Sequence, residues 1–452
     1  MVKRITEQEV ERMRLYVYIR RIVVLCAIST LGLAFNLGNC KANETKAGIL
    51  ENRSLIIAPL IGTHYFSLPG TARFCLEEMV NELGEGYAQG LGFSVAVQYM
   101  YYTDDASNDW SYNPDLDPVI PESFRLAEET GLPVLFHLNG GPWSGKGGLY
   151  WHLFEDINNR QWNQDNVPSS DKRPATLYMC ISRYNSEYQE YKRRNLQQVL
   201  GLISAWAAAH PDLFLGVSTD SEVSMDPRNL YTDYNPKTLQ EWRDYLFGKG
   251  IYSPSGRYAE EARSPIFANI AEFNAYFGTH FDSVEEIDPP RNPPDGSLLW
   301  QEWQSFRVLL VKHHVQDMVN IIAACGIPPE KIFTHQAVTQ DFFGWASPLE
   351  TALCRGASLG VTLFANDTVD ESLYQRFIET GSPWAAVEFN PLAYKDYERN
   401  LRALRLAKKY GAIVICPFWY FGEGGHLIHG TDFARAIRDF VKEEIRRAKN
   451  PS

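Results

Sequence analysis

Short apolar runs alternate with helix-like patterns along the chain from residue 50 onward. Eight of these runs are five to eight residues long and mostly apolar, which is typical of strands that are buried on both faces. We expect strands at residues 55–62, 93–100, 133–138, 213–219, 331–336, 359–364, 385–389 and 412–418.

Helix-like patterns fill the intervals between these runs. In the clearest, residues 306–325, apolar side chains recur every three or four positions, and Gly326 followed by Pro328 ends the pattern. A second helix is predicted from about residue 394 to 410, where Gly411 ends it. A third, amphipathic helix is predicted at 432–448.

Strands that alternate with helices pair in parallel through right-handed crossovers. Eight such units predict an α/β fold, the (β/α)8 or TIM barrel. The alternative is a doubly wound sheet with a side domain, which usually has a glycine-rich phosphate-binding turn after its first strand. Residues 62–70 follow the first predicted strand and lack the pattern GxGxxG, so we favour the barrel.

Two of the predicted strand-to-helix connections are much longer than the others. They cover about residues 139–184 after the third strand and about 220–302 after the fourth. Loops at the carboxyl ends of barrel strands hold the active site and tolerate insertions. We therefore expect long insertions that form the walls of a cleft, within one barrel domain that spans residues 46–452.

Residues 1–45 differ in character from the rest of the chain. Six basic residues precede an uncharged apolar run at 22–38, which is long for the core of a signal peptide and short for a membrane-spanning helix. The positive flank predicts a cytoplasmic N-terminus and export of the chain beyond the apolar run. The barrel would then be periplasmic, extracellular or anchored to the membrane by this segment. The alternative is an amphipathic or buried N-terminal helix.

The amino-acid composition argues against several functional classes of protein. The formal net charge of −12 argues against binding to nucleic acid. The seven cysteines are dispersed and form no CxxC pair, so no metal cluster, redox motif or disulfide scaffold is indicated. Eleven Trp and 24 Tyr are a high aromatic content, and aromatic side chains in a polar cleft suit the apolar faces of sugar rings. No cofactor is predicted.

Two glutamates occupy matching places in this pattern. Glu222 comes three residues after the fourth predicted strand, and Glu388 lies at the end of the seventh. On a closed barrel these positions face each other across the mouth, and two carboxyl groups across a cleft are what the cleavage of a glycosidic bond needs. The alternative is that each glutamate is a solvated loop residue. This alternative is weaker for Glu388, because Val387 and Phe389 place its charge inside an apolar segment.

Further polar and aromatic side chains lie at predicted strand ends, where they would line the same mouth. For any single His or Trp, a structural role is about as plausible as a functional one, and the recurrence at many strand ends is the stronger signal. The candidates for substrate binding are His137, Asn139, Trp143, Asp220, Ser221, His335, Gln336, Asn366, Asn390 and Trp419, with Trp151 and Trp345 for further subsites.

Residues 216–222, of sequence GVSTDSE, resemble the fourth-strand motif Gly-x-x-x-Asp-Asn-Glu of clan A glycoside hydrolases, and especially of family 42 β-galactosidases. Residues 234–246, 274–291 and 300–307 are similar to segments that come after this motif in that family. The resemblance implies that Glu222 is the general acid/base, that Glu388 is the nucleophile and that Trp419 floors a sugar subsite. Ser221 stands where the family usually has an Asn that contacts the sugar 2-hydroxyl.

These features favour a retaining glycoside hydrolase that cleaves a β-linked carbohydrate by double displacement. One alternative, motivated by Ser221, is a barrel that binds carbohydrate without cleaving it. Another is a metal-dependent hydrolase, which usually has a His-x-His pair after its first strand, where this chain offers only His64. His313 and His314 point about 100° apart on a helix, so no metal site is predicted. The sugar, its linkage, exo or endo action and the oligomeric state stay open.

Overall fold

The computed structural model divides the chain into two units, residues 1–52 and residues 53–452. It describes residues 55–84, 90–98, 103–104, 109–110, 118–139, 156–169, 186–225, 231–292, 296–340, 342, 346–422 and 427–449. The predicted export segment at 1–45 and most of the predicted insertion at 139–184 lie outside the described residues.

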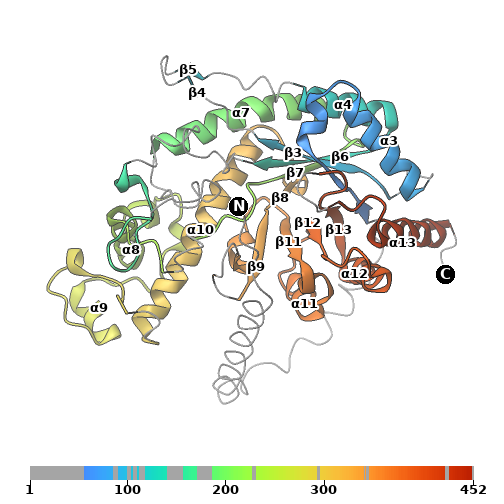
Figure 1. Cartoon of the computed structure of the whole chain (residues 1–452). Coiled ribbons are helices and arrows are strands. Elements are labelled where there is room, and N and C mark those ends of the chain that lie inside the picture. The colour runs from blue at the N-terminus through green and yellow to red at the C-terminus, as the bar shows by residue number, and fades with distance from the viewer. Residues whose placement is uncertain are drawn as a thin grey trace, which may run out of the picture. The chain divides into compact units, whose positions relative to one another are not determined.

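The strands form two parallel sheets, with helices packed around them (Figure 1). One sheet has the order β1-β13-β12-β11-β9-β10, in which the strands are Ile56–Ile57, Ala412–Pro417, Trp384–Asn390, Leu359–Phe364, Gln336–Thr339 and Ser347–Pro348. The other has the order β2-β3-β6-β7-β8, with strands Leu60–Ile61, Phe93–Gln98, Val134–Asn139, Phe214–Ser218 and Ile332–Phe333. A separate antiparallel pair joins β4 (Thr103–Asp104) to β5 (Asp109–Trp110).

The two sheets share two stretches of chain. The first predicted strand contains both β1, which pairs with β13, and β2, which pairs with β3. The fifth contains both β8, which pairs with β7, and β9, which pairs with β11. The first strand therefore lies between the last and the second, an arrangement consistent with a TIM barrel. A doubly wound sheet would instead leave its outermost strands without such partners.

The expectation of unbroken first and fifth strands is wrong. Pro59 interrupts the first because proline has no backbone N–H to donate to a ladder. In the fifth, the backbone changes partner: Phe333 accepts from Thr219 N–H at 2.9 Å, whereas Thr334 N–H donates to Ser358 at 3.1 Å. Each break lies where the chain passes from one neighbouring strand to another.

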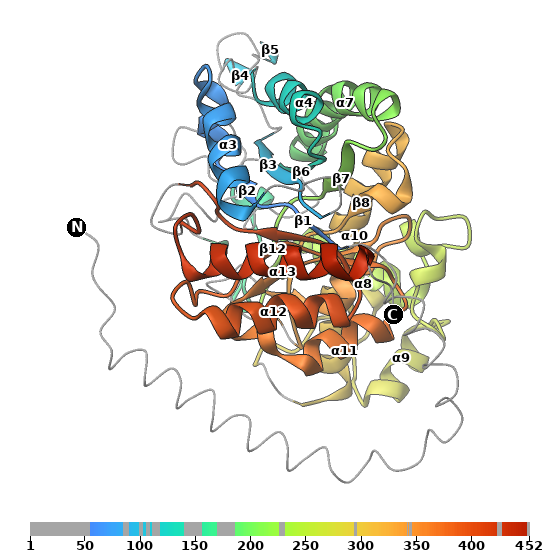
Figure 2. The same ribbon diagram turned by 90° about the vertical axis from the view of Figure 1, so that its right-hand side faces the viewer.

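In the described part of the chain, seven helices cover the outer face of the sheets. They are α3 (Thr71–Leu83), α4 (Val119–Thr130), α7 (Ser186–Ala209), α10 (Leu298–Ala324), α11 (Glu371–Glu379), α12 (Tyr397–Lys409) and α13 (Asp432–Lys449). Figure 2 shows α12 and α13 side by side over β12, where Phe389 meets Phe433. The predicted helix at 306–325 begins earlier, at Leu298, because the Ser297 side chain caps it by accepting from Trp300 N–H. In the described part, no helix is long and apolar enough to cross a membrane.

Successive residues of a strand face opposite sides of the sheets. Phe136 of β6 belongs to the large hydrophobic core beneath the helices, whereas its neighbour Leu135 belongs to a small separate cluster. We call the side of the small cluster the inner face. Its buried members are Ala58, Leu135, Leu215, Phe333, Ala385, Val387, Val414 and Cys416.

Between β7 and α10 the chain forms α8 (Pro236–Phe247), α9 (Ile270–Phe277) and several short 3-10 turns. This segment has a hydrophobic cluster of its own, centred on fully buried aromatic side chains such as Trp242 and Phe273, which packs against Trp303 of α10. Figure 1 shows α8 and α9 (yellow-green) beside α10 and away from the strands. Packing against α10 therefore stabilises the fold of this segment.

Candidate active site

A β-bulge turns Glu388 toward the inner face. Val361 of β11 pairs with Ala386 of β12, but the next residue, Thr362, pairs with Glu388. The other neighbour of β12 shows the same shift, since Ala386 and Phe389 pair with Ile415 and Pro417 of β13. One extra residue in β12 lets Val387 and Glu388 both face inward, whereas strict alternation would turn Glu388 toward the helices.

Glu222 is held by the backbone of the fifth strand. Its N–H donates to the His335 carbonyl at 2.8 Å. The carbonyl of the next residue, Val223, accepts from Gln336 Nε2 and from Ser347 Oγ, each at 3.0 Å. Glu222 has a φ of +56°, in the left-handed region that few residues other than glycine occupy. Such backbone conformations persist where surrounding bonds hold them, and they cluster at functional sites.

The two carboxyl groups influence each other. Burial raises the pKa of Glu222 above its usual value. Burial also raises the pKa of Glu388 well above its usual value, and the negative charge of Glu222 raises it further. The Thr362 hydroxyl opposes both shifts. The charge of one carboxyl group therefore disfavours ionisation of the other.

Two histidines lie beside the carboxyl pair. His137 Nδ1 is 3.0 Å from Ser218 Oγ, which is 3.4 Å from His335 Nδ1. His335 Nε2 is 3.9 Å from Glu388 Oε1. Burial lowers the pKa of His137 to about 3, and burial together with His137 lowers the pKa of His335 well below its usual value. Both imidazoles are therefore neutral at neutral pH.

Several buried polar atoms around this site have no hydrogen-bond partner among the described residues. They are Nε2 of His137, Nε2 of His335, Nδ2 of Asn390 and Oε1 of Gln336. A buried polar atom without a partner is costly, so such a group at one end of the sheets fits a ligand that carries hydroxyl groups. The Glu388 side chain keeps 18% of its surface exposed.

The other predicted site residues take different places. Asn139 is the half-buried last residue of β6, and Ser221 is half-buried beside Glu222. Asn390 is buried, and its Oδ1 accepts from Leu392 N–H at 3.1 Å and from the Tyr394 hydroxyl at 2.8 Å. Trp419 is half-buried just after β13. The three tryptophans at 143, 151 and 345 lie outside the described residues.

For two predicted residues the environment differs from the expected one. Asp220 is 2% exposed and forms an ion pair with Lys192 of α7, so its carboxylate is engaged beneath the site. Asn366 is exposed and accepts from Arg399 Nη2 at 2.8 Å, next to α12. Both come two residues after a strand, and the direction of such a side chain depends on the path of the loop.

Sequence reasoning missed Ser218 and Thr362. Each is a small polar residue inside an apolar strand, and each faces inward between two chemically active side chains. A polar residue at an inward position of a buried strand was the available signal. Lys192 was also missed, and a single lysine within an amphipathic helix gives no such signal.

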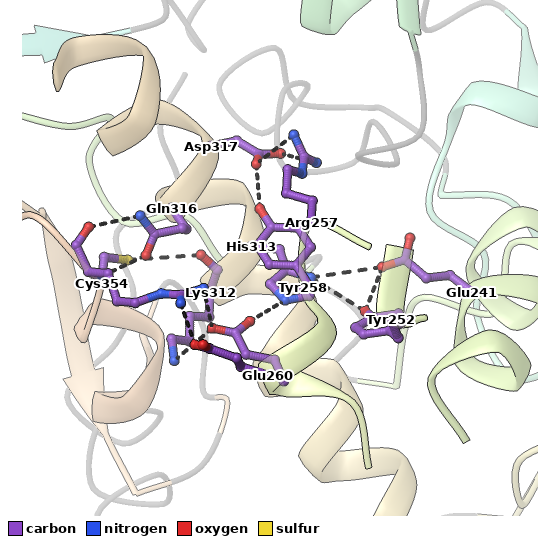
Figure 3. Close-up of polar contacts among 12 residues, drawn as sticks. Glu241, Tyr252, Arg257, Tyr258, Glu260, Lys312, His313, Gln316, Asp317 and Cys354 are labelled. Carbon is purple, nitrogen blue, oxygen red and sulfur yellow. Dashed lines mark hydrogen bonds and ion pairs between the residues drawn. The ribbon is translucent and has the colours of Figure 1, made fainter. Parts of the chain in front are cut away.

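The two adjacent histidines of α10 diverge, as the helix geometry predicted. His313 Nε2 is 2.6 Å from Glu261 Oε2, and its ring stacks on Tyr258 with centroids 3.6 Å apart (Figure 3). His314 Nε2 is 2.7 Å from Lys192 Nζ on another side of the helix. Within the described ranges, no group of three His, Cys, Asp or Glu residues is placed to hold a metal ion.

Solved structures that resemble this chain have little sequence in common with it. The catalytic domain of beta-amylase from Paenibacillus polymyxa matches with a TM-score of 0.55 at 10% identity, over 87% of this chain and 99% of that one. A GH5-4 broad specificity endoglucanase from an uncultured bacterium matches with a TM-score of 0.43 at 10% identity, over 88% of this chain and 95% of that one.

A mannanase, man26 of Bacillus subtilis, matches with a TM-score of 0.42 at 9% identity, over 83% of this chain and 84% of that one. No protein-family model and no curated protein matches this chain. The likeness to the beta-amylase domain shows the fold alone, an α/β fold with parallel sheets that is consistent with a TIM barrel.

Proposed function

We propose that this chain is a retaining glycoside hydrolase with Glu222 as the general acid/base and Glu388 as the nucleophile. The observation that carries the proposal is that β12 bulges at Glu388, where the negative charge of Glu222 lies close enough to raise the pKa of Glu388. A retaining mechanism needs one protonated and one ionised carboxyl group about 5–5.5 Å apart, facing the same bond. Two carboxyl groups that each disfavour ionisation of the other are suited to hold different charge states.

The proposed roles place the proton on Glu222, although the pKa of Glu388 is the more strongly raised of the two. When Glu222 is protonated, its repulsion of Glu388 disappears, which removes one cause of the raised pKa of Glu388. The Thr362 hydroxyl and the His335 imidazole then stabilise the Glu388 carboxylate. Glu222 protonates the leaving oxygen while Glu388 attacks the anomeric carbon, and Glu222 afterwards takes a proton from water that cleaves the glycosyl-enzyme.

The strand pairings support the proposal that the two sheets are halves of one closed (β/α)8 barrel. The first and fifth strands each contribute one part to each sheet. The carboxyl ends of all eight strands would then meet at one mouth, with the long segments after β6 and β7 as its walls.

Phe364 supports a carbohydrate ligand. Val361 and Leu363 of β11 belong to the core beneath the helices, so Thr362 and Phe364 share the inner face. Phe364 lies two residues beyond Thr362 and is 41% exposed. An exposed ring just above the carboxyl pair offers an apolar surface to the face of a sugar ring.

The proposal is tested with aryl β-glycosides and two alanine variants. Glu222→Ala should keep the first step on dinitrophenyl glycosides, which leave without protonation, and azide should rescue its turnover as a β-glycosyl azide. Glu388→Ala should be inactive, and azide should yield the α-glycosyl azide. Wild-type turnover in Glu388→Ala, or inverted product from the wild-type protein, contradicts the proposal.

Ser221 favours a second candidate, a protein that binds carbohydrate without cleaving it. A Ser hydroxyl offers one donor where an Asn amide offers two, so one contact to the sugar is lost. Binding on a glycan array without hydrolysis of any aryl glycoside would favour this candidate. Export through the segment at 1–45 is likewise a proposal, and alkaline phosphatase fused after residue 45 would report it by its activity outside the cytoplasm.

A further inference from the structure

Ser218 bridges two neutral histidines on the inner face. Its Oγ lies 3.0 Å from His137 Nδ1 and 3.4 Å from His335 Nδ1, and the two rings are 5.8 Å apart. The three side chains come from β6, β7 and the turn between β8 and β9. The Nε2 atoms of both histidines are buried and lack hydrogen-bond partners among the described residues.

A count of protons restricts the tautomers. A serine hydroxyl has one hydrogen, and each neutral imidazole carries one N–H. Ser218 can donate its hydrogen to the Nδ1 of only one histidine, whose own hydrogen must then lie on Nε2. From a histidine to which it does not donate, the hydroxyl accepts the Nδ1–H, and the Nε2 of that histidine is a bare acceptor. At least one of the two histidines therefore carries its hydrogen on Nδ1.

Glu388 sets the direction of this chain of hydrogen bonds. Its Oε1 is 3.9 Å from His335 Nε2, and the carboxylate form that the proposed function assigns to Glu388 attracts an N–H but repels a nitrogen lone pair. His335 therefore carries its hydrogen on Nε2 and accepts the Ser218 hydrogen on Nδ1. Ser218 then accepts from His137 Nδ1–H, which leaves His137 Nε2 as an acceptor.

We propose that Ser218 is a positioning residue that makes His137 Nε2 a hydrogen-bond acceptor for one hydroxyl of the substrate and turns His335 Nε2–H toward Glu388. The part that concerns substrate rests on the proposed function. The ligand class is a sugar with a free hydroxyl at one ring position. A deoxy or O-methyl sugar at that position leaves His137 Nε2 buried and unpaired.

The first test reads the tautomers directly and requires no activity. The full chain is labelled with ¹⁵N-histidine, and long-range ¹H–¹⁵N spectra distinguish protonated from bare ring nitrogens. The chain has ten histidines, and the signals of His137 and His335 are assigned as those that disappear in His137→Gln and His335→Gln. We expect hydrogen on Nδ1 of His137 and on Nε2 of His335. The same tautomer on both, or the reverse assignment, overturns the proposal even if the protein hydrolyses glycosides.

The second test compares Ser218→Ala with Ser218→Thr, which keeps the hydroxyl. Ser218→Ala should release the fixed tautomers, and Ser218→Thr should retain them. If Ser218→Ala does not fold, the wild-type spectrum still decides. Unchanged tautomers in a folded Ser218→Ala protein would show that Ser218 does not set them.

The third test concerns the substrate and uses a set of monodeoxy aryl β-glycosides. One deoxy position should lower kcat/KM of the wild-type protein by about 10- to 100-fold, the cost of one buried unpaired acceptor. The same substrate should suffer little further loss in His137→Phe, because that acceptor is gone. An equal loss of kcat/KM in both proteins would show that His137 does not contact this hydroxyl. A protein that hydrolyses none of these substrates contradicts the proposed function and leaves the tautomer result standing.

Discussion

Lys192 of α7 forms a buried ion pair with Asp220, two residues before Glu222, so an outer helix is tied to the loop that carries the proposed acid/base. The side chains are 6% and 2% exposed, and Lys192 Nζ also lies 2.7 Å from His314 Nε2 of α10. Removal of one partner from a buried pair leaves an uncompensated charge, whereas exposed pairs contribute little.

We therefore expect Lys192→Met to lower the free energy of unfolding by about 3–5 kcal/mol in urea denaturation. The control is the next residue. Arg193 forms an exposed pair with Glu190 at 2.7 Å, so Arg193→Met should cost less than about 1 kcal/mol. Asp220→Asn should recover part of the stability that Lys192→Met loses. Equal effects of the two single variants would show that the Lys192 pair is not buried in solution.

The raised pKa of Glu388 predicts a pH-dependent effect of Glu388→Gln on stability. A carboxyl group whose pKa is raised by folding contributes most below its usual pKa of 4.5 and loses that contribution as pH rises through the folded-state value. Glu388→Gln should therefore raise Tm at pH 7, and the difference should fade toward pH 4. Thermal unfolding followed by circular dichroism between pH 4 and pH 8 measures this difference in Tm.

Glu190 provides a control of opposite sign. Its hydrogen bonds with Arg193 and Arg194 lower its pKa to about 2, so its contribution is present above pH 4.5 and is lost as pH falls toward 2. Glu190→Gln should lower Tm slightly at neutral pH, by a small amount because the pair is exposed. A lower Tm for Glu388→Gln at pH 7 would contradict the burial of that carboxyl group.

Gly216 allows β7 to approach the fifth strand. A Cβ at this position would lie 2.4 Å from the Lys331 carbonyl oxygen, and φ is +142°. Gly216→Ala should therefore destabilise the protein by more than about 1 kcal/mol. Gly201 lies in α7 with nothing within 4 Å of a Cβ, so Gly201→Ala should stabilise by about 0.5–1 kcal/mol. Urea denaturation of both variants checks this, and equal effects would contradict the close approach.

Phe364 should affect substrate affinity more than stability. Phe364→Ala should raise KM for aryl glycosides by about tenfold if its ring contacts a sugar face, an effect of about 1.4 kcal/mol. Phe74 of α3 is 59% exposed on the outer side, so Phe74→Ala should leave KM unchanged. Equal KM values for the two variants would exclude Phe364 from the sugar-binding surface.

The eight apolar runs seen in the sequence correspond to strands in the structure, because a strand buried on both faces must be apolar along its whole length. The rule that polar residues at strand ends meet led to His137 and His335, which the structure places on either side of Ser218. Asp220 and Asn366, chosen by the same rule, contact Lys192 and Arg399. Their roles depended on loop paths that periodicity does not describe.

Local pattern in this sequence determined which segments became strands and helices, since periodicity and apolar composition act over a few residues. Tertiary structure alone decided that β12 has one extra residue relative to both neighbouring strands just after Ala386, which turns Glu388 inward beside Thr362. It also decided that Ser218 bridges two histidines that lie 81 and 117 residues away in the chain. Register and side-chain direction depend on partners that are distant in sequence, and such partners become neighbours only when the sheets form.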